Sequence, residues 1–252
     1  SYRKIRNTFR YLLGNLNDVY EDIDLENVDI KKLPELEQFM LHKMYKLNSN
    51  FNKYFNNYDF HNLYKELLNF CTVDLSAFYF DVRKDTLYCD QKNSEKRKST
   101  IMLLNIILNS LLKWFAPILS FTTEEIYQLM IKKNKSIHLE KFLNFPKKFE
   151  NSALNEKWSQ LLKIRDLCNL SIEEKRANKE IGSSLEASLK VNLDKQSIET
   201  VKGIDLAELF ITSSVEIEKT VSEKIIVKTN KAKGDKCAVC WKIYLDKCPR
   251  HG

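Results

Sequence analysis

The chain has 252 residues, 43% of them hydrophobic, with only 5 glycines and 4 prolines. This length can bury a sizeable core in one or two domains, and the scarcity of glycine and proline argues against a β-sandwich or a disordered chain and favours long helices. Lys and Arg number 41 against 34 Asp and Glu, and the resulting net charge of +7 suits an anionic partner such as a nucleic acid or a membrane surface.

No apolar run comes near the roughly 20 residues that cross a bilayer. The longest run, residues 101–112, is interrupted by Asn105, Asn109 and Ser110, so no membrane partner is expected. The opening residues 1–4 do not resemble a signal peptide, and the lack of an initiator methionine predicts a fragment of a longer polypeptide.

Residues 1–17 are predicted to form an amphipathic helix. Its apolar residues recur at helical spacing: Ile5, Phe9, Leu12, Leu13 and Leu16. Arg3, Arg6 and Arg10 recur at the same period on another face. These arginines could hold an anion, or they could simply form a solvated charged surface.

Further helices are expected along the next hundred residues. After a polar connection at 18–32, Pro34 opens a helix at its first turn, and the Asn-rich stretch 48–57 predicts the turn into a third helix over 61–70. Another helix is expected over 75–82.

The segment 90–99 is polar and is predicted to be an exposed loop, followed by a strongly apolar, central helix over 100–115 that Pro117 terminates. Thr122 and Glu125 match a capping box, which predicts a helix starting there and running to about residue 132. Residues 136–149 are expected to be an irregular connection.

The composition then changes. A long helix is predicted over 154–179, and period-two alternation over 185–193 predicts a half-buried strand. A short helix over 197–206, strands over 210–217 and 224–228, and a basic linker over 229–236 complete the pattern.

The fold class predicted from these elements is mainly α, in three parts. A helical bundle occupies 1–153, a long helix with a small α+β domain occupies 154–230, and a metal-binding module occupies 231–252. At the end of the long helix, Lys175, Arg176 and Lys179 could contact a phosphate, although interaction with the helix dipole explains them more simply.

The six cysteines fall into two groups. Cys71, Cys89 and Cys168 lie scattered in helical or apolar surroundings and are expected to be buried, reduced thiols.

The other group, Cys237, Cys240, Cys248 and His251, has the spacing C-x2-C-x7-C-x2-H. Two tight turns of this kind can present four ligands to one tetrahedral Zn²⁺, so a structural zinc site is predicted. A redox CxxC pair and a disulfide are weaker alternatives, because neither a βαβ context nor secretory features are present. A residue beyond Gly252 could replace His251 as the fourth ligand.

Trp241 follows the second cysteine on a module with almost no interior. Its indole could be a stacking platform for an RNA base, or it could pack over the metal-binding loop.

Five stretches, in the same order along the chain, resemble the C-terminal part of bacterial and organellar isoleucyl-tRNA synthetases. They are 1–13 (SYRKIRNTFRYLL), 74–79 (DLSAFY) with 84–89 (KDTLYC), 116–126 (APILSFTTEEI), 179–187 (KEIGSSLEA) and 237–241 (CAVCW). The cysteine module distinguishes this family from its valyl and leucyl relatives.

The resemblance implies a helical anticodon-binding domain, a junction domain and a zinc module that reaches the anticodon stem-loop. The whole enzyme attaches isoleucine to its tRNA with ATP and Mg²⁺, using a Rossmann catalytic domain and an inserted editing domain. Both class I signatures, His-Ile-Gly-His and Lys-Met-Ser-Lys-Ser, are absent here, so this chain should be inactive alone. Its expected partners are isoleucine tRNA and its own N-terminal catalytic and editing domains, in the cytoplasm or an organellar matrix.

The resemblance further implies tRNA contacts from Arg3, Arg6, Arg10 and Trp241, with Lys242 a weaker candidate. Two positions depart from the family pattern: Val239 stands where relatives often have Arg, and His251 where they often have Cys. Two other functions remain open, a stand-alone non-catalytic RNA-binding or adaptor protein and a zinc-dependent protein-interaction module.

Overall fold

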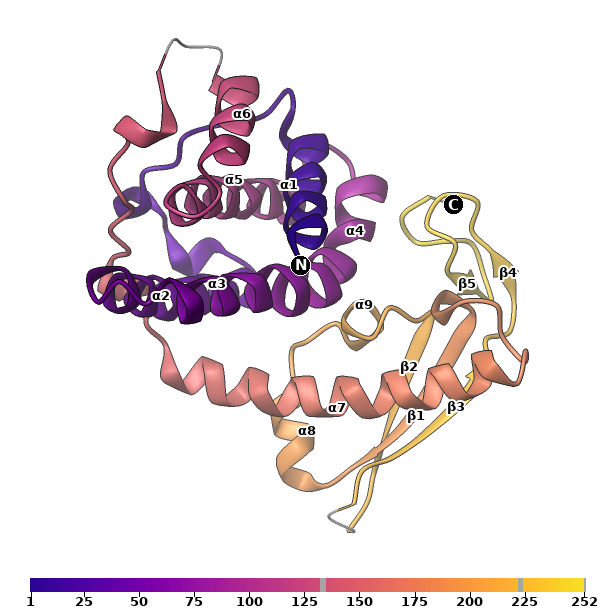
Figure 1. The fold of residues 1–252 in the computed structure, drawn as a ribbon. Helices are drawn as coiled ribbons and strands as arrows, with labels where there is room; N and C mark the ends of the chain where they lie inside the picture. Colours follow the sequence, from indigo (N-terminus) through magenta and orange to yellow (C-terminus); the bar gives the residue numbers. More distant parts are fainter. Residues whose placement is uncertain (132–134, 222–223, 252) are drawn as a thin grey trace. The chain divides into compact units, whose positions relative to one another are not determined.

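The computed structural model describes residues 1–131, 135–221 and 224–251. These residues divide into two compact units, Ser1–Asn151 and Ser152–Gly252 (Figure 1). No described helix combines the length and the apolar character needed to cross a membrane. The first unit is helical and the second combines helices with a small sheet, as the sequence predicted.

The described helices of the first unit are α1 (Tyr2–Leu16), α2 (Glu35–Asn56), α3 (Phe60–Asn69), η3 (Phe70–Tyr79), α4 (Phe80–Cys89), α5 (Glu95–Phe115) and α6 (Ser120–Ile131). Short 3₁₀ turns at Leu25–Asn27, Ile30–Lys32, Ile137–Leu139 and Lys147–Phe149 lie in the connections. The predicted end of the last helix, at residue 132, falls outside the described residues.

Helix α5 is the centre of this unit, as its apolar sequence predicted. It contacts α1, α2, α4 and α6, and every residue from Leu103 to Phe115 is buried. Trp114, fully buried near its end, donates from Nε1 to Oδ1 of Asn48 over 3.1 Å. The core of the unit is therefore organised around one apolar helix.

The predicted turn at 48–57 is wrong, because α2 continues to Asn56. Asn48 is buried as the acceptor of Trp114, and Phe51 is fully buried beside the same indole. These tertiary contacts hold the Asn-rich segment in the helix. The turn instead lies at 57–59, where Tyr58 has a positive φ and the Asp59 carboxylate caps α3.

The predicted break between the helices at 61–70 and 75–82 is also absent. The chain stays helical from α3 through η3 to α4, and η3 is a wider π-helical stretch. Cys71, Leu75 and Tyr79 in this stretch are completely buried, so packing stabilises the continuous helix.

The predicted exposed loop at 90–99 is shorter than expected. Helix α5 begins at Glu95, and the Ser94 hydroxyl accepts a hydrogen bond from the Arg97 N–H at 3.4 Å. Polar residues in its first turn face solvent before the helix enters the core.

The capping box at Thr122 and Glu125 is wrong as well, since α6 starts at Ser120. The chain is already turning there, because the Thr123 N–H donates to the Leu119 carbonyl at 3.0 Å. The Thr122 hydroxyl is instead hydrogen-bonded to the Tyr2 hydroxyl at 2.8 Å.

A buried ion pair connects α2 to α4. The Glu37 carboxylate accepts hydrogen bonds from Nε and Nη2 of Arg83, both at 2.7 Å, and from the Tyr79 hydroxyl at 3.0 Å. All three side chains are buried. A buried charge needs such partners, because its desolvation would otherwise be very costly.

The elements of the second unit are α7 (Ser152–Ala177), a 3₁₀ turn (Ser184–Glu186), β1 (Ala187–Leu193), α8 (Lys195–Val201), α9 (Leu206–Leu209), β2 (Ser214–Lys219), β3 (Ile226–Lys231), β4 (Asp235–Lys236) and β5 (Ile243–Tyr244). The single helix expected over 197–206 is thus two shorter helices.

β1 is the central strand of a sheet with order β2-β1-β3. It is parallel to β2, which it reaches through α8 and α9, and antiparallel to β3. Every second residue of β1 from Ala187 to Leu193 is buried, which confirms the period-two prediction, and α7 packs against the sheet through β3.

The basic linker predicted over 229–236 is wrong, because β3 extends to Lys231 and β4 begins at Asp235. Thr229 is buried, and its hydroxyl is hydrogen-bonded to that of Ser171 at 2.7 Å. Because Thr229 is buried and pairs with Leu189 of β1, this segment belongs to the sheet despite the lysines around it.

Candidate metal site and nucleic-acid interface

The four predicted metal ligands, Cys237, Cys240, Cys248 and His251, converge at one point beside the β4–β5 hairpin, within the second unit. Their ligand atoms all lie within 4.8 Å of one another. Sγ of Cys240 is 3.9 Å from Sγ of Cys248, and Nδ1 of His251 is 3.6 Å from Sγ of Cys237 and 3.4 Å from Sγ of Cys248.

These separations fit one tetrahedral ion. Ligand bonds of about 2.3 Å to sulfur and about 2.0 Å to nitrogen place neighbouring ligand atoms roughly 3.5–3.8 Å apart. The three thiols and one imidazole of the cluster can therefore bind a metal ion. Four protein ligands leave no coordination position for a substrate, which is typical of a structural site.

Local backbone geometry prepares the first ligand turn. The Trp241 N–H donates to the Cys237 carbonyl at 3.0 Å, and the Cys237 N–H donates to the Lys242 carbonyl at 2.9 Å. Hydrogen bonds from the backbone N–H groups of Cys240 and Val239 lower the pKa of the Cys237 thiol to about 6. The thiolate that a metal ion requires is thus favoured.

Gly234 permits the hairpin that carries these ligands. Its φ is +118°, and a Cβ at this position would lie 2.0 Å from the Tyr244 carbonyl oxygen. Only glycine fits so close an approach of two backbones.

Trp241 directly follows the ligand Cys240 in the chain, and the residue is 60% exposed. Nζ of Lys236 lies 5.6 Å from the centroid of the ring. The backbone of Trp241 has a φ of +62°, an uncommon value for a bulky residue. Most of the indole surface is therefore available to another molecule.

Lys242 has a different environment from Trp241. It is 9% exposed, and its Nζ lies 3.4 Å from the Ala207 carbonyl oxygen. The next residue, Ile243, donates its N–H to the Ser213 hydroxyl at 2.7 Å. Both contacts connect the metal-binding module to the α9–β2 region of its own unit.

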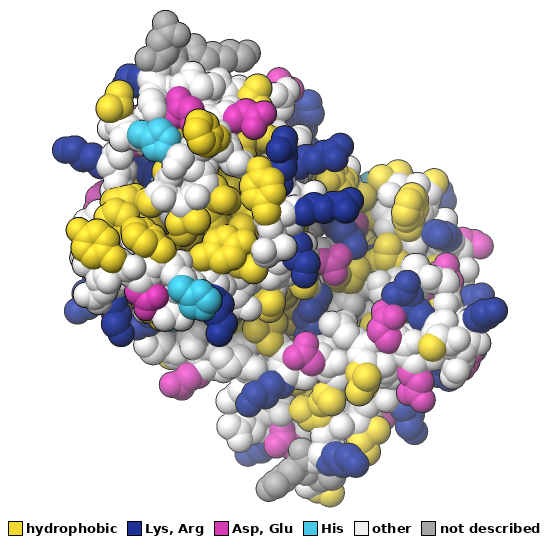
Figure 2. Space-filling model, in the orientation of Figure 1, with side chains coloured by type: hydrophobic (Ala, Val, Ile, Leu, Met, Phe, Trp, Pro, Cys, Tyr) yellow, Lys and Arg dark blue, Asp and Glu magenta, His cyan; other side chains and the backbone are white. Residues whose placement is uncertain are grey.

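In the first unit, Arg3, Arg6 and Arg10 are all exposed along one face of α1. Figure 2 shows dark blue side chains gathered over the position that α1 has in Figure 1. Hydrogen bonds with Thr122 and Arg6 lower the pKa of the Tyr2 hydroxyl. Within the described part of the chain, Arg3 and Arg10 form no ion pair, so their charges face solvent.

Comparison with known proteins identifies the family. The family described as the anticodon-binding domain of tRNA ligases matches residues 37–192. The chain belongs to this family. This match runs from the first turn of α2 through the later helices of the first unit and α7 into β1, and it does not include α1.

The chain also aligns along nearly its whole length with isoleucine–tRNA ligases. It is 66% identical over 251 residues to the protein of Pelagibacter ubique, which covers 100% of this chain and 28% of that protein. It is 37% identical over 258 residues to the protein of Agrobacterium fabrum, covering 98% of this chain and 26% of that protein. The match with that of Bartonella quintana is 36% over 256 residues, covering 97% and 26%.

These matches confirm the resemblance found in the sequence. The chain corresponds to the C-terminal part of its isoleucine–tRNA ligase relatives and spans about a quarter of their length.

Sequence reasoning missed the residues that support the metal-binding module. The Ser213 hydroxyl accepts a hydrogen bond from the Ile243 N–H, and the Ala207 carbonyl accepts one from the Lys242 ammonium group. Nothing in the sequence around Ser213 or Ala207 indicates these contacts. Tyr244, whose hydroxyl lies 4.0 Å from Sγ of Cys240, was also missed. Its place within the C-x7-C loop was the one signal that could have pointed to it.

Proposed function

We propose that this chain is the tRNA-recognition part of an isoleucine–tRNA ligase. The observation that carries the proposal is the alignment of the whole chain, at 66% identity, with a protein of that name. The complete enzyme would attach isoleucine to its tRNA in the cytoplasm with ATP and Mg²⁺, through catalytic and editing domains that precede this part. The residues described here would bind and position the tRNA.

In this proposal, two surfaces contact the tRNA. The arginines of α1 supply fixed positive charge for phosphates or for the faces of unpaired bases. Trp241 supplies an exposed aromatic surface on which an anticodon base can stack, with Lys236 beside it. Lys242 remains the weaker candidate, because its ammonium group is buried against Ala207.

We further propose that Zn²⁺ occupies the cluster of Cys237, Cys240, Cys248 and His251. Zinc would supply folding energy to a module whose two strands have only two residues each. The bound ion would hold the two ligand turns together and so fix the backbone that carries Trp241.

Binding to isoleucine tRNA tests the function directly. The full chain, loaded with zinc, is titrated with isoleucine tRNA and with a second tRNA over a series of salt concentrations. We expect preference for isoleucine tRNA and an affinity that falls as salt rises, because phosphate contacts release counterions. Absent or salt-independent binding would favour a zinc-dependent protein-interaction module.

A triple variant tests the α1 surface. Arg3→Ala with Arg6→Ala and Arg10→Ala should weaken tRNA binding, whereas Lys31→Ala with Lys53→Ala and Lys65→Ala removes the same charge from exposed positions elsewhere in the unit. Equal losses in the two variants would show a general charge effect and contradict a specific role for α1.

A stand-alone RNA-binding or adaptor protein is less well supported, because the relatives are about four times longer than the chain. The sequence upstream of Ser1 separates the two functions. Class I signatures there support the ligase, and their absence from a complete gene supports the stand-alone protein.

A further inference from the structure

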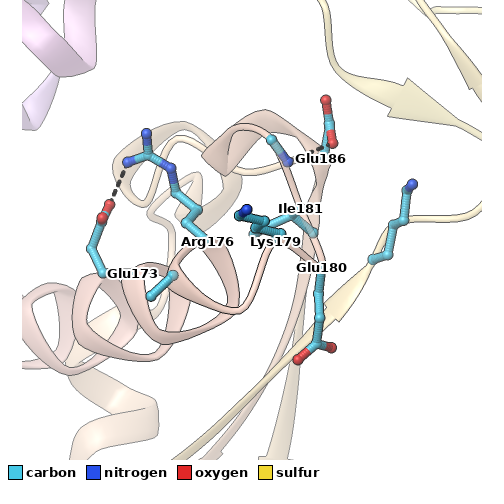
Figure 3. A pocket seen from close by; sticks show the side chains of 9 residues that line it. Glu173, Arg176, Lys179, Glu180, Ile181 and Glu186 are labelled. Carbon is cyan, nitrogen blue, oxygen red and sulfur yellow. Dashed lines mark hydrogen bonds and ion pairs between the residues drawn. The ribbon is translucent and has the colours of Figure 1, made fainter.

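A surface cleft of about 550 Å³ lies where α7 ends and the chain turns toward β1 (Figure 3). Its charged lining residues are Glu173, Arg176, Lys179, Glu180, Glu186 and Lys231. Lys231 lies more than forty residues after the others and reaches the cleft because β3 pairs with β1, opposite Ala187. The adjoining Ala232 N–H donates to the Glu186 carbonyl at 2.8 Å.

Two of the three carboxylates of this cleft form ion pairs, and the third accepts a backbone hydrogen bond. Glu173 pairs with Nη1 of Arg176 at 2.6 Å, and Glu180 pairs with Nζ of Lys175 at 2.9 Å. Glu186 accepts the Gly182 N–H at 3.0 Å. Lys179 and Lys231 are exposed and form no ion pair within the described residues, so the cleft presents two ammonium groups that no carboxylate contacts, although Glu186 keeps its own charge.

Lys179 occupies a backbone position that favours glycine. Its φ is +58°, its N–H donates to the Arg176 carbonyl, and the Glu180 N–H donates to the Lys175 carbonyl. This pattern is a Schellman motif with Lys179 at the left-handed C′ position. The backbone of a residue other than glycine is strained in this conformation. Such backbone strain is found more often at functional sites.

The helix dipole does not account for Lys179. The dipole acts within the last turn of a helix, where Lys175 and Arg176 already supply two cations. Lys179 lies beyond that turn, and its own N–H and that of Glu180 satisfy two carbonyls of the last turn, those of Arg176 and Lys175.

We propose that Lys179 and Lys231 bind a backbone phosphate of RNA in this cleft. The inference rests on the proposed function and adds a contact site to it. An ammonium group is a compact point charge that binds phosphate without reading base identity. The cleft therefore contributes to the position of the RNA and to the salt dependence of its binding, and leaves the choice of tRNA to other contacts.

The variant Lys179→Gly separates binding from folding. Glycine adopts a positive φ without strain, so the melting temperature of the variant should equal or exceed that of the wild type. Its affinity for isoleucine tRNA should nevertheless fall roughly threefold to tenfold at low salt, with the slope of log K against log salt reduced by about 0.7–0.9. Lys231→Ala should show the same loss of affinity and slope.

Lys195→Ala is the matched control, because Lys195 is exposed on the same unit, lies at the start of α8 and lines no part of the cleft. It should bind as the wild type does.

The proposal is overturned if the wild type binds tRNA with salt dependence while Lys179→Gly and Lys231→Ala bind equally well. It is also overturned if Lys195→Ala loses as much affinity as they do. Failure of the wild-type chain to bind any tRNA would instead refute the proposed function.

Discussion

Replacing Trp241 with alanine should weaken binding of isoleucine tRNA by about 1–3 kcal/mol, or roughly fivefold to 150-fold, which is the usual contribution of one base stacked on an aromatic side chain. Trp241 is 60% exposed and has Lys236 near its ring, so a base can stack on the exposed part of the indole. Losing the Lys236 contact should cost the free protein only about 0.5–1 kcal/mol, the range of an exposed cation–π pair. Because Trp241 is not a metal ligand, the metal content should not change.

The assay is tRNA binding by the intact chain at fixed salt, with metal content measured on the same samples. Trp241→Phe keeps an aromatic face and should recover most of the affinity. Leu245→Ala, at a position that is 81% exposed in the same module, serves as the control and should bind normally. Unchanged affinity in Trp241→Ala, with the metal retained, would refute the stacking role.

Three further predictions concern folding. Glu37→Gln should lower the free energy of unfolding by about 3–5 kcal/mol, because the buried Arg83 guanidinium loses its carboxylate, and a loss below about 1 kcal/mol in urea denaturation would contradict this. Chelation of the bound metal should remove hydrogen-exchange protection from the module at 235–251 and leave that of α5 unchanged; a module that stays protected would exclude a metal-dependent fold. Burial lowers the pKa of His42 below its ordinary 6.5, and its Nδ1 accepts the Asn151 N–H at 2.8 Å. The unfolded chain therefore takes up this proton first as pH falls, so stability should decrease below about pH 6.5, and His42→Gln should show a smaller decrease in thermal melts between pH 7.5 and 5.5.

The sequence predicted an element or a site correctly wherever a single periodic pattern or a single ligand spacing was enough to define it. The apolar run that became α5 predicted the central helix, and alternation over 185–193 predicted β1 and its buried face. The spacing of Cys237, Cys240, Cys248 and His251 predicted four ligands at one point, because two residues between ligands leave room for a single tight turn. These features depend on residues close together in the chain.

Features that depend on distant residues needed the tertiary structure. Asn48 belongs to a helix because Trp114 donates to it from α5, and Thr122 lies inside α6 because the preceding residues have already begun to turn. In the same way, strand pairing brings Lys231 to the cleft beside Lys179, and the burial of Lys242 against Ala207 follows from the docking of the module. Local propensity is weak compared with such contacts. The sequence by itself therefore determined the types of element and the set of metal ligands. Only the tertiary structure decided where helices begin and end and which charges remain exposed.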